Sequence, residues 1–350
     1  MRALIGDVSN LTVYQARQQA QKILGGLIEG VNVTDKRRED RARSVTLEKA
    51  FVDFLEARKN LAAKTVYEYR RLLDTCLADW KSKPFIEITR DMVARRHAQL
   101  GAVSESQANL AMRVLRSILN FAGDKYEDSK GRALLLENPV RRLSSARAWY
   151  RVERRQNFIK PHELAPWFRA VQSLPADRKI VADYLLLLVL TGLRRTEAAS
   201  MRWENVDLNA RTLTVKETKN KEDHTLPLSD FLFEMLRARQ KDAIGKYVFP
   251  GSGKSGYLSE PKKTVKEVAK HSGIPFTPHD LRRTFATIVN NLETTLSYFS
   301  IKRLLNHKTQ DVTGGYIQHD VERLRAPMQQ VTDFILRAAG VKDSADLMKI

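Results

Sequence analysis

Four side chains able to handle protons or phosphate lie within one short window near the end of the sequence. The window begins with HDLRRTF and ends with LLNHKTQDVTGGYIQ, and it contains His279, Arg282, His307 and Tyr316. Histidine exchanges protons near neutral pH, arginine can give two hydrogen bonds to one phosphate, and tyrosine can act as a nucleophile. No metal-ligand spacing, glycine-rich phosphate loop or carboxylate pair accompanies them. The pattern indicates a phosphate ester attacked by tyrosine.

Two residues upstream can complete this chemistry if the fold brings them to the window. Arg194 follows an apolar run in TGLRRTE, and Lys219 lies near the tip of a predicted hairpin. Arg194 and Arg282 would neutralise the nonbridging oxygens of a DNA phosphodiester. Lys219 would protonate the departing 5′ oxygen, although Lys216 and Lys221 flank it in the same hairpin.

The remaining roles fall to His279, His307 and Tyr316. His279 would accept the phenolic proton, His307 would donate to a phosphate oxygen, and Tyr316 would form a covalent phosphotyrosine that conserves the energy of the cleaved bond. Such a reaction needs neither ATP nor a metal, so no cofactor is expected. Each residue taken singly has a structural interpretation: a tyrosine in helix packing, surface arginines, and capping or core histidines. Only their joint order favours catalysis.

The composition favours a polyanionic partner. The 350 residues include 60 Lys and Arg against 41 Asp and Glu, a formal charge of +19. A merely soluble basic protein is the alternative. The single cysteine, Cys76, excludes an intramolecular disulfide framework and a cysteine-based zinc cage. The longest strongly apolar run, Tyr184 to Leu190, is too short to span a membrane, so we expect a cytoplasmic protein without a membrane partner.

Helical periodicity dominates the sequence from Thr46 to about Tyr126. We expect one helix from Leu47, one opening with a Thr65 and Glu68 capping box, one after Thr89 and one beginning at Ser104. These predict a compact helical domain over residues 44–140. The segment before it, residues 1–43, reads as one amphipathic helix followed by a charged linker.

Residues 141–157 form a basic connector between two predicted domains. The arginines in it are Arg141, Arg142, Arg147, Arg151, Arg154 and Arg155, with Trp149 and Tyr150 among them. So many like charges favour a segment that contacts DNA. Arginines on the helices before it, such as Arg113 and Arg116, could also lie along a phosphate backbone, but a solvated helix face explains any one of them equally well.

The second predicted domain covers residues 158–324 and combines helices with a small sheet. A helix starts at Pro161, and Ile180 to Leu190 is apolar on every side, as in a fully buried helix. Thr212 to Lys216 and His224 to Leu228 alternate as the two strands of a hairpin. The fold class is therefore mainly α with a small β-sheet, an α+β arrangement.

The order TGLRRTE, Lys219, HDLRRTF, LLNH and a tyrosine nine residues after His307 closely resembles the tyrosine recombinase, or phage integrase, family. The motifs cover about Phe158 to Gln318, and the helical region resembles that family's core-binding domain. The resemblance implies Arg194, His279, Arg282 and His307 as the phosphate-binding and proton-handling group. It also implies Lys219 as the acid, Tyr316 as the nucleophile, and Glu197 as an acidic residue that holds the site together.

One residue departs from the family pattern. Asn306 stands where Leu-Gly-His would place glycine, which affects the geometry of the helix end rather than the chemistry.

The resemblance implies a site-specific recombinase that cleaves and rejoins DNA through a 3′-phosphotyrosyl intermediate, integrating or excising a mobile element. Its partners would be double-stranded attachment sites, three further copies in a homotetramer, and, as often in this family, a host DNA-bending protein and an excisionase. Two alternatives stay open. A type IB topoisomerase would only nick and reseal, and a DNA-binding regulator would have no need of Tyr316 as a nucleophile.

Both ends of the chain carry helices with open roles. LTVYQARQQAQKILGGLIEG resembles the last helix of an arm-type DNA-binding domain, and no strands precede it, which suggests a remnant or truncated domain. The helix predicted from Arg325 to Ala339, within residues 325–350, is placed to pack on a neighbouring protomer. The alternative is that it caps its own domain.

Overall fold

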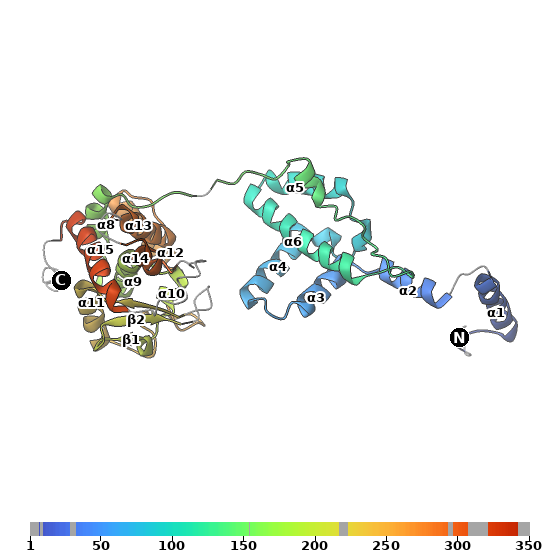
Figure 1. The fold of residues 1–350 in the computed structure, drawn as a ribbon, viewed down its shortest axis with the longest axis horizontal. Coiled ribbons are helices and arrows are strands. Elements are labelled where there is room, and N and C mark those ends of the chain that lie inside the picture. The colour runs from blue at the N-terminus through green and yellow to red at the C-terminus, as the bar shows by residue number, and fades with distance from the viewer. Residues whose placement is uncertain are drawn as a thin grey trace. The chain divides into compact units, whose positions relative to one another are not determined.

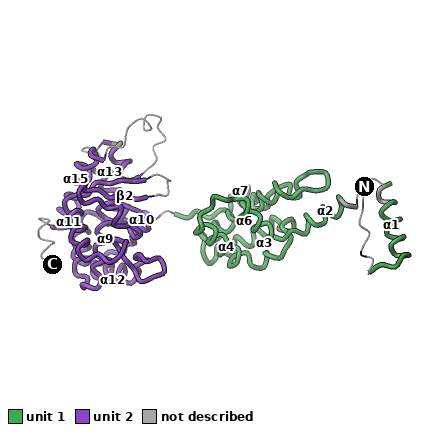
Figure 2. Tube along the Cα trace, turned by 90° about the horizontal axis from the view of Figure 1, so that it is seen from below, with its two compact units in different colours: residues 1–154 green, residues 155–350 purple. Residues whose placement is uncertain are grey.

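The computed structural model describes Asp7 and residues 10–28, 33–153, 155–216, 223–292, 297–306 and 321–341. The chain forms two compact units, residues 1–154 and 155–350 (Figure 2). The division falls inside the predicted basic connector. No helix within the described ranges is long and apolar enough to cross a membrane.

The first unit is helical and has its core around α6 (Glu105–Lys125), as Figure 1 shows. The helices that contact α6 are α3 (Leu47–Ala57), α4 (Ala63–Cys76) and α5 (Arg90–Gly101). Apolar side chains at helical spacing meet in one core, among them Phe51, Phe54, Leu72, Leu115 and Ile118. The unit also contains α1 (Val13–Ile28), α2 (Val33–Arg43) and α7 (Arg141–Ser145).

Side-chain caps fix three of the predicted helix starts, the first at Thr46, whose hydroxyl accepts from the backbone amide of Lys49 in α3. Thr89 and Ser104 are the N-caps of α5 and α6, and their hydroxyls accept from the backbone amides of Met92 and Gln107. The predicted start at Thr65 is wrong, because α4 begins at Ala63 after the N-cap Ala62.

The charged segment of residues 31–43, predicted as a linker, contains the helix α2. Most of its residues are good helix formers, and Arg43 pairs with Glu39 one turn earlier at 2.8 Å. Because this helix has no apolar face, hydrophobic periodicity did not predict it.

The second unit packs helices around a buried central helix, α9 (Lys179–Thr191). Tyr184, Leu185, Leu188 and Leu190 of α9 lie in the main core, which confirms the helix predicted to be apolar on every side. The other helices are α8 (Leu164–Gln172), α10 (Arg195–Ala199), α11 (Asp230–Lys241), α12 (Lys262–Ser272), α13 (Pro278–Asn291), α14 (Tyr298–Leu304) and α15 (Arg325–Ala338).

The sheet of this unit has three antiparallel strands in the order β1-β2-β3. They are β1 (Val206–Asp207), β2 (Thr212–Val215) and β3 (His224–Pro227). Thr212 lies opposite Pro227 and Val215 opposite His224, which confirms the predicted pairing of these two strands. Helices with one small sheet confirm the mainly α, α+β fold class.

The last described helix, α15, packs on its own unit. Met328, Val331 and Ile335 are fully buried in the main core, and α15 contacts α8, α9 and α13. Its apolar face is therefore occupied within the unit, which is the alternative that the sequence left open for this helix.

Candidate active site

The C-terminal end of α9 places Arg194 beside the core. Gly192 ends the helix in the left-handed conformation, with φ of 62°, and the chain then turns so that Arg194 becomes the N-cap of α10. Both carboxylate oxygens of Glu197 hold Arg194. One accepts from its backbone amide at 2.9 Å, and the other accepts from Nη1 at 2.8 Å. Glu197 therefore orients a guanidinium whose other N–H groups can bind an anion.

Arg282 lies on α13, and two carbonyls distant in sequence fix its guanidinium. Nη1 donates to the Gly192 carbonyl at 2.5 Å, and Nη2 donates to the Leu305 carbonyl at 2.7 Å. Burial lowers the pKa of Arg282, the nearby charge of Arg194 lowers it further, and Glu197 opposes this. Arg194 and Arg282 therefore lie close enough to repel each other. Among the described contacts, no carboxylate bonds directly to Arg282. A bound anion such as phosphate would relieve their repulsion.

The end of α14 supplies one of these carbonyls. Asn306, directly after Leu305, adopts a positive φ of 50°, and its amide donates to the Arg303 carbonyl at 3.0 Å. Asparagine is one of the few residues besides glycine that accepts this conformation at little cost. The departure from Leu-Gly-His therefore keeps the sharp helix end.

His279 lies on the same helix as Arg282, one turn before it. Burial lowers its pKa first, and the positive charges of Arg283, Arg282 and Arg194 lower it further, while Asp280 opposes them. A lowered pKa keeps the imidazole neutral at neutral pH, the form that can accept a proton. Asp280 also accepts from the Thr277 amide at 2.9 Å and hydroxyl at 2.8 Å, which caps α13 and fixes where His279 emerges.

The structure adds His224, which the sequence suggested only as the start of a strand. The side chain is 3% exposed at the beginning of β3. Burial and the charges of Arg303 and Arg282 lower its pKa to about 4, although Glu197 and the Leu304 backbone act in the opposite direction. The one available signal was a polar residue at an inward strand position, two before the buried Leu226.

The structure therefore brings together four of the residues singled out in the sequence: Arg194, Glu197, His279 and Arg282. Lys219, His307 and Tyr316 lie outside the described residues. The described part of the site can bind an anion with two oriented arginines and can take up a proton at a neutral histidine.

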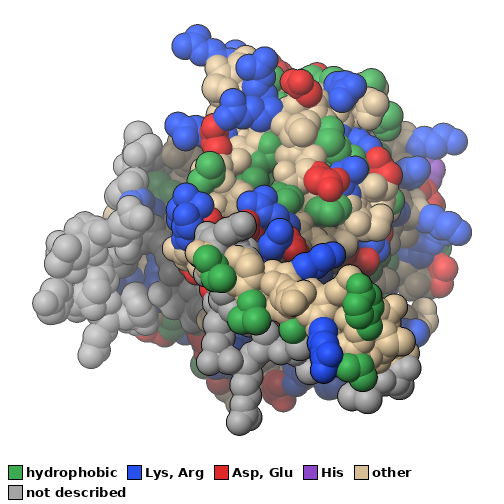
Figure 3. Space-filling model, turned by 90° about the vertical axis from the view of Figure 1, so that its right-hand side faces the viewer, with side chains coloured by type: hydrophobic (Ala, Val, Ile, Leu, Met, Phe, Trp, Pro, Cys, Tyr) green, Lys and Arg blue, Asp and Glu red, His purple; other side chains and the backbone are tan. Residues whose placement is uncertain are grey.

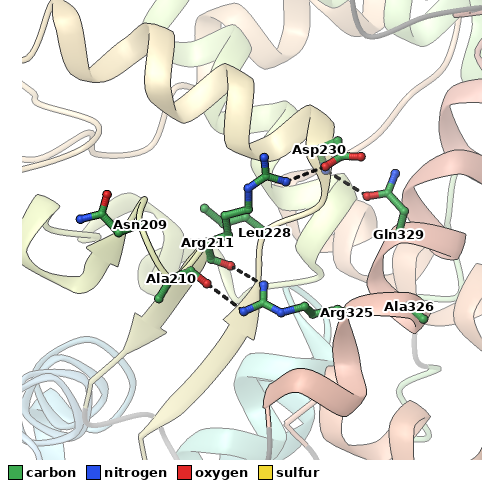
Figure 4. A pocket seen from close by; sticks show the side chains of 8 residues that line it. All are labelled: Asn209, Ala210, Arg211, Leu228, Asp230, Arg325, Ala326 and Gln329. Atoms are coloured by element: carbon green, nitrogen blue, oxygen red, sulfur yellow. Dashed lines mark hydrogen bonds and ion pairs between the residues drawn. The ribbon is translucent and has the colours of Figure 1, made fainter.

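A separate surface depression lies between the β1–β2 turn, the start of α11 and the start of α15. Figure 4 shows Arg325 reaching the β1–β2 turn, where its Nη2 donates to the Ala210 carbonyl at 2.8 Å. Gln329 accepts from the Asp230 amide at 2.9 Å, and Arg211 pairs with Asp230 at the same separation. None of the candidate catalytic residues lines this depression, so we assign it a structural role.

The first unit holds the beginning of the basic connector. Trp149 lies under Arg113 and Arg116, each 5.8 Å from the ring centre. The backbone carbonyl of Tyr150 accepts from the Asn109 side chain at 2.9 Å. The chain is thus anchored to this unit as far as Tyr150. Lys and Arg side chains are spread over the face shown in Figure 3, with Asp and Glu among them.

Buried His224 predicts a dependence of stability on pH. Its folded-state pKa of about 4 lies below the ordinary value of 6.5, so its contribution is complete above pH 6.5 and is lost as the pH falls toward 4. Between pH 7.5 and 5 this amounts to about 2 kcal/mol of unfolding free energy. Urea unfolding should show that His224→Gln loses less stability over this interval than the wild type. The control is His271→Gln at an exposed position of α12, and equal losses in all three proteins would contradict the prediction.

The sequence and the fold of this chain also resemble those of known proteins. The pattern of the phage integrase family matches residues 157–323. The prophage integrase IntF of Escherichia coli K12 is 24% identical, over 99% of this chain and 82% of its own length.

Solved integrase structures share the fold, and two of them illustrate the likeness. The Tn1549 transposon integrase in complex with transposon right end DNA has a TM-score of 0.61 at 17% identity, covering 82% of this chain and all of that one. A lambda integrase tetramer bound to a Holliday junction has a TM-score of 0.59 at 20% identity, covering 90% of this chain and 88% of that one.

Proposed function

The chain belongs to the phage integrase family of tyrosine recombinases and is a site-specific DNA recombinase, and on this premise we propose that Tyr316 is its nucleophile and Arg194 and Arg282 its phosphate-binding pair. The observation that carries this assignment is the fixed pair of guanidiniums. Glu197 orients one, and the carbonyls of Gly192 and Leu305 orient the other. Arginines held in this way stabilise a pentavalent phosphate without reorganising as charge develops on it.

The proposed reaction begins when the Tyr316 hydroxyl attacks the phosphorus of a DNA phosphodiester. The new bond joins the tyrosine oxygen to phosphorus, and the bond from phosphorus to the 5′ oxygen breaks. His279 takes the phenolic proton, consistent with its lowered pKa. Lys219 gives a proton to the leaving 5′ oxygen, and His307 donates to a nonbridging oxygen. A 5′ hydroxyl from a second duplex then reverses the sequence and rejoins the strand.

The partners proposed for the chain follow from its charge and from its relatives. A formal charge of +19 suits duplex DNA, with the arginines near Trp149 in contact with the backbone. The solved lambda integrase assembly is a tetramer on a Holliday junction, and we propose the same stoichiometry here. A host DNA-bending protein and an excisionase would supply directionality.

Removal of the Tyr316 hydroxyl tests the nucleophile. Duplexes retained by the full-length protein from a random-sequence pool are rebuilt with nicks at successive positions, so that cleavage releases a short fragment and traps the adduct. The wild type should form a protein–DNA adduct that survives denaturing electrophoresis, whereas Tyr316→Phe should form none.

The control for this experiment is Tyr67→Phe, because Tyr67 is exposed on α4. It should form the adduct at the wild-type rate. An adduct that persists in Tyr316→Phe would assign the nucleophile to another residue. Bound duplexes without any adduct in the wild type would exclude strand transfer on these sites and leave a binding protein.

A further inference from the structure

Asn109 on α6 binds the backbone of the basic connector with a buried side chain. The residue is 4% exposed. Its Nδ2 donates to the Tyr150 carbonyl at 2.9 Å, and its Oδ1 accepts from the Tyr150 amide at 3.3 Å. Nε2 of the buried His97 lies 3.0 Å from the same Oδ1 and orients the amide group. Burial of an amide costs free energy unless it is hydrogen-bonded, and here both of its polar atoms hold one residue of the connector.

The ring of Tyr150 is held as closely as its backbone. It lies against the His97 ring, with 4.6 Å between the ring centres. It also lies over Gly101, the last residue of α5, where an added Cβ would be 2.1 Å from the Tyr150 hydroxyl oxygen. Only glycine leaves room for the phenol at this position. Two independent contacts therefore fix Tyr150 to the first unit.

The connector meets a second anchor in the other unit at Ile159. The Ile159 side chain is 1% exposed, and its amide donates to the Thr284 hydroxyl at 2.8 Å. Thr284 is fully buried on α13, and its hydroxyl donates in turn to the Asp280 carbonyl at 3.0 Å. The same helix carries His279 and Arg282. The connector thus ends on the helix that supplies two residues of the candidate site.

Eight residues, 151–158, separate the two anchors. Those that the structure describes form neither helix nor strand, and no hydrogen bond joins them to either unit. A chain extends by at most about 3.3 to 3.6 Å per residue, so the Cα atoms of Tyr150 and Ile159 can lie no more than about 30 Å apart. The two anchors set this limit, because the basic residues before Tyr150 belong to the folded first unit.

We propose that the connector is a tether of fixed length between two anchors, Asn109 in the first unit and Thr284 on α13, and that this length determines whether both units can hold one duplex. The inference rests on the proposed function and adds to it a positioning residue, Asn109, outside the catalytic unit. Two linked binding units gain about 100-fold or more in affinity when both can engage, and the gain vanishes when the linker is too short.

A shortened connector tests the fixed length. Val152 and Gln156 are exposed and uncharged, so their deletion removes about 7 Å of reach and keeps every charge of the connector. The probe is the set of nicked duplexes described above, at a protein concentration equal to the wild-type Kd. We expect the deletion to lower the rate of Tyr316 adduct formation by at least about 10-fold, because both units can no longer engage the duplex together.

Release of Tyr150 should restore the shortened protein. Among the described backbone bonds, the nearest one before it joins the Ala148 amide to the Leu143 carbonyl at 2.8 Å. Release therefore returns two residues, 149 and 150, to the tether. They replace the two that were deleted.

Two variants release Tyr150 by different routes. Asn109→Leu removes the main-chain anchor. Gly101→Ala displaces the ring and leaves Asn109 in place, and alanine is the better helix former. Each of them, combined with the deletion, should bring adduct formation back to within about 3-fold of the wild type. The control is Val114→Ala in the core of α6, which lowers stability without releasing Tyr150 and should leave the shortened protein slow.

The outcomes distinguish the inference from the function beneath it. A shortened protein that cleaves at the wild-type rate would overturn the proposal, because the tether would then be slack. Shortened proteins that stay slow with both release variants would overturn it as well. If Asn109→Leu fails to fold, as judged by circular dichroism, Gly101→Ala decides, and its own failure to fold would show that Tyr150 belongs to the core rather than to an anchor.

In each of these cases a wild-type adduct that is lost in Tyr316→Phe would preserve the proposed function. A wild type that forms no adduct would remove the function and this inference together.

Discussion

Arg282→Lys is expected to lower the rate of adduct formation by about 100- to 1000-fold while the protein remains folded and bound to DNA. Lysine keeps the charge, but a single ammonium cannot donate to both the Gly192 and Leu305 carbonyls and also give paired hydrogen bonds to a phosphate. Loss of one oriented donor to a developing negative charge costs about 3 to 4 kcal/mol in the transition state. Single-turnover cleavage of the nicked duplexes measures this rate.

The DNA affinity of Arg282→Lys should change much less than its cleavage rate. Most of the binding free energy comes from many phosphate contacts, so a conserved charge at one position should leave Kd within about 3-fold. The control is Arg237→Lys, because Arg237 is exposed on α11 and pairs with Glu234. It should cleave at the wild-type rate. A lysine variant at position 282 that cleaved within 3-fold of wild type would show that Arg282 contributes only charge.

Local sequence signals were sufficient to predict much of the secondary structure around the site. The hairpin could be predicted because Thr212 to Lys216 and His224 to Leu228 alternate in polarity, and these two strands pair with each other in the structure. The starts of α5 and α6 were readable because Thr89 and Ser104 are strong caps. The left-handed end of α9 was signalled by Gly192, the residue type that adopts this conformation most readily. These features each depend on a few neighbouring residues.

The contacts that hold the site residues in place could not be predicted from neighbouring residues. Arg282 meets the Gly192 carbonyl across 90 residues of sequence and the Leu305 carbonyl across 23. Backbone carbonyls are present at every position, so no residue type marks the ones that will be used. His224 was missed for a related reason. Its lowered pKa depends on Arg303, Arg282 and Glu197, which lie on three different helices and come near it only in the folded unit.

The sequence also did not predict what covers the apolar face of α15. An amphipathic helix predicts an apolar face, but not whether that face is covered by its own domain or by a neighbour. Burial of Met328, Val331 and Ile335 in the main core answers this within the unit.

Gly192→Ala is expected to damage both the fold and the site, because Gly192 meets two separate constraints. Its φ of 62° is unfavourable for alanine by about 1 to 2 kcal/mol. A Cβ there would also lie 2.3 Å from Cδ1 of Phe285, which is fully buried and cannot move freely. Overpacking of this kind adds about 1 to 3 kcal/mol. The unfolding free energy measured in urea should therefore fall by about 2 to 5 kcal/mol.

Gly273→Ala isolates the backbone part of this cost. Gly273 ends α12 in the same left-handed conformation, with φ of 72°, but an added Cβ there meets nothing within 4 Å. Its alanine variant should lose only about 1 to 2 kcal/mol and should cleave DNA at the wild-type rate. Gly192→Ala should in addition cleave more slowly where it is still folded, because the displaced carbonyl is an acceptor of Arg282. If the two variants lost the same stability and cleaved equally well, neither the contact with Phe285 nor the carbonyl anchor would matter to the site.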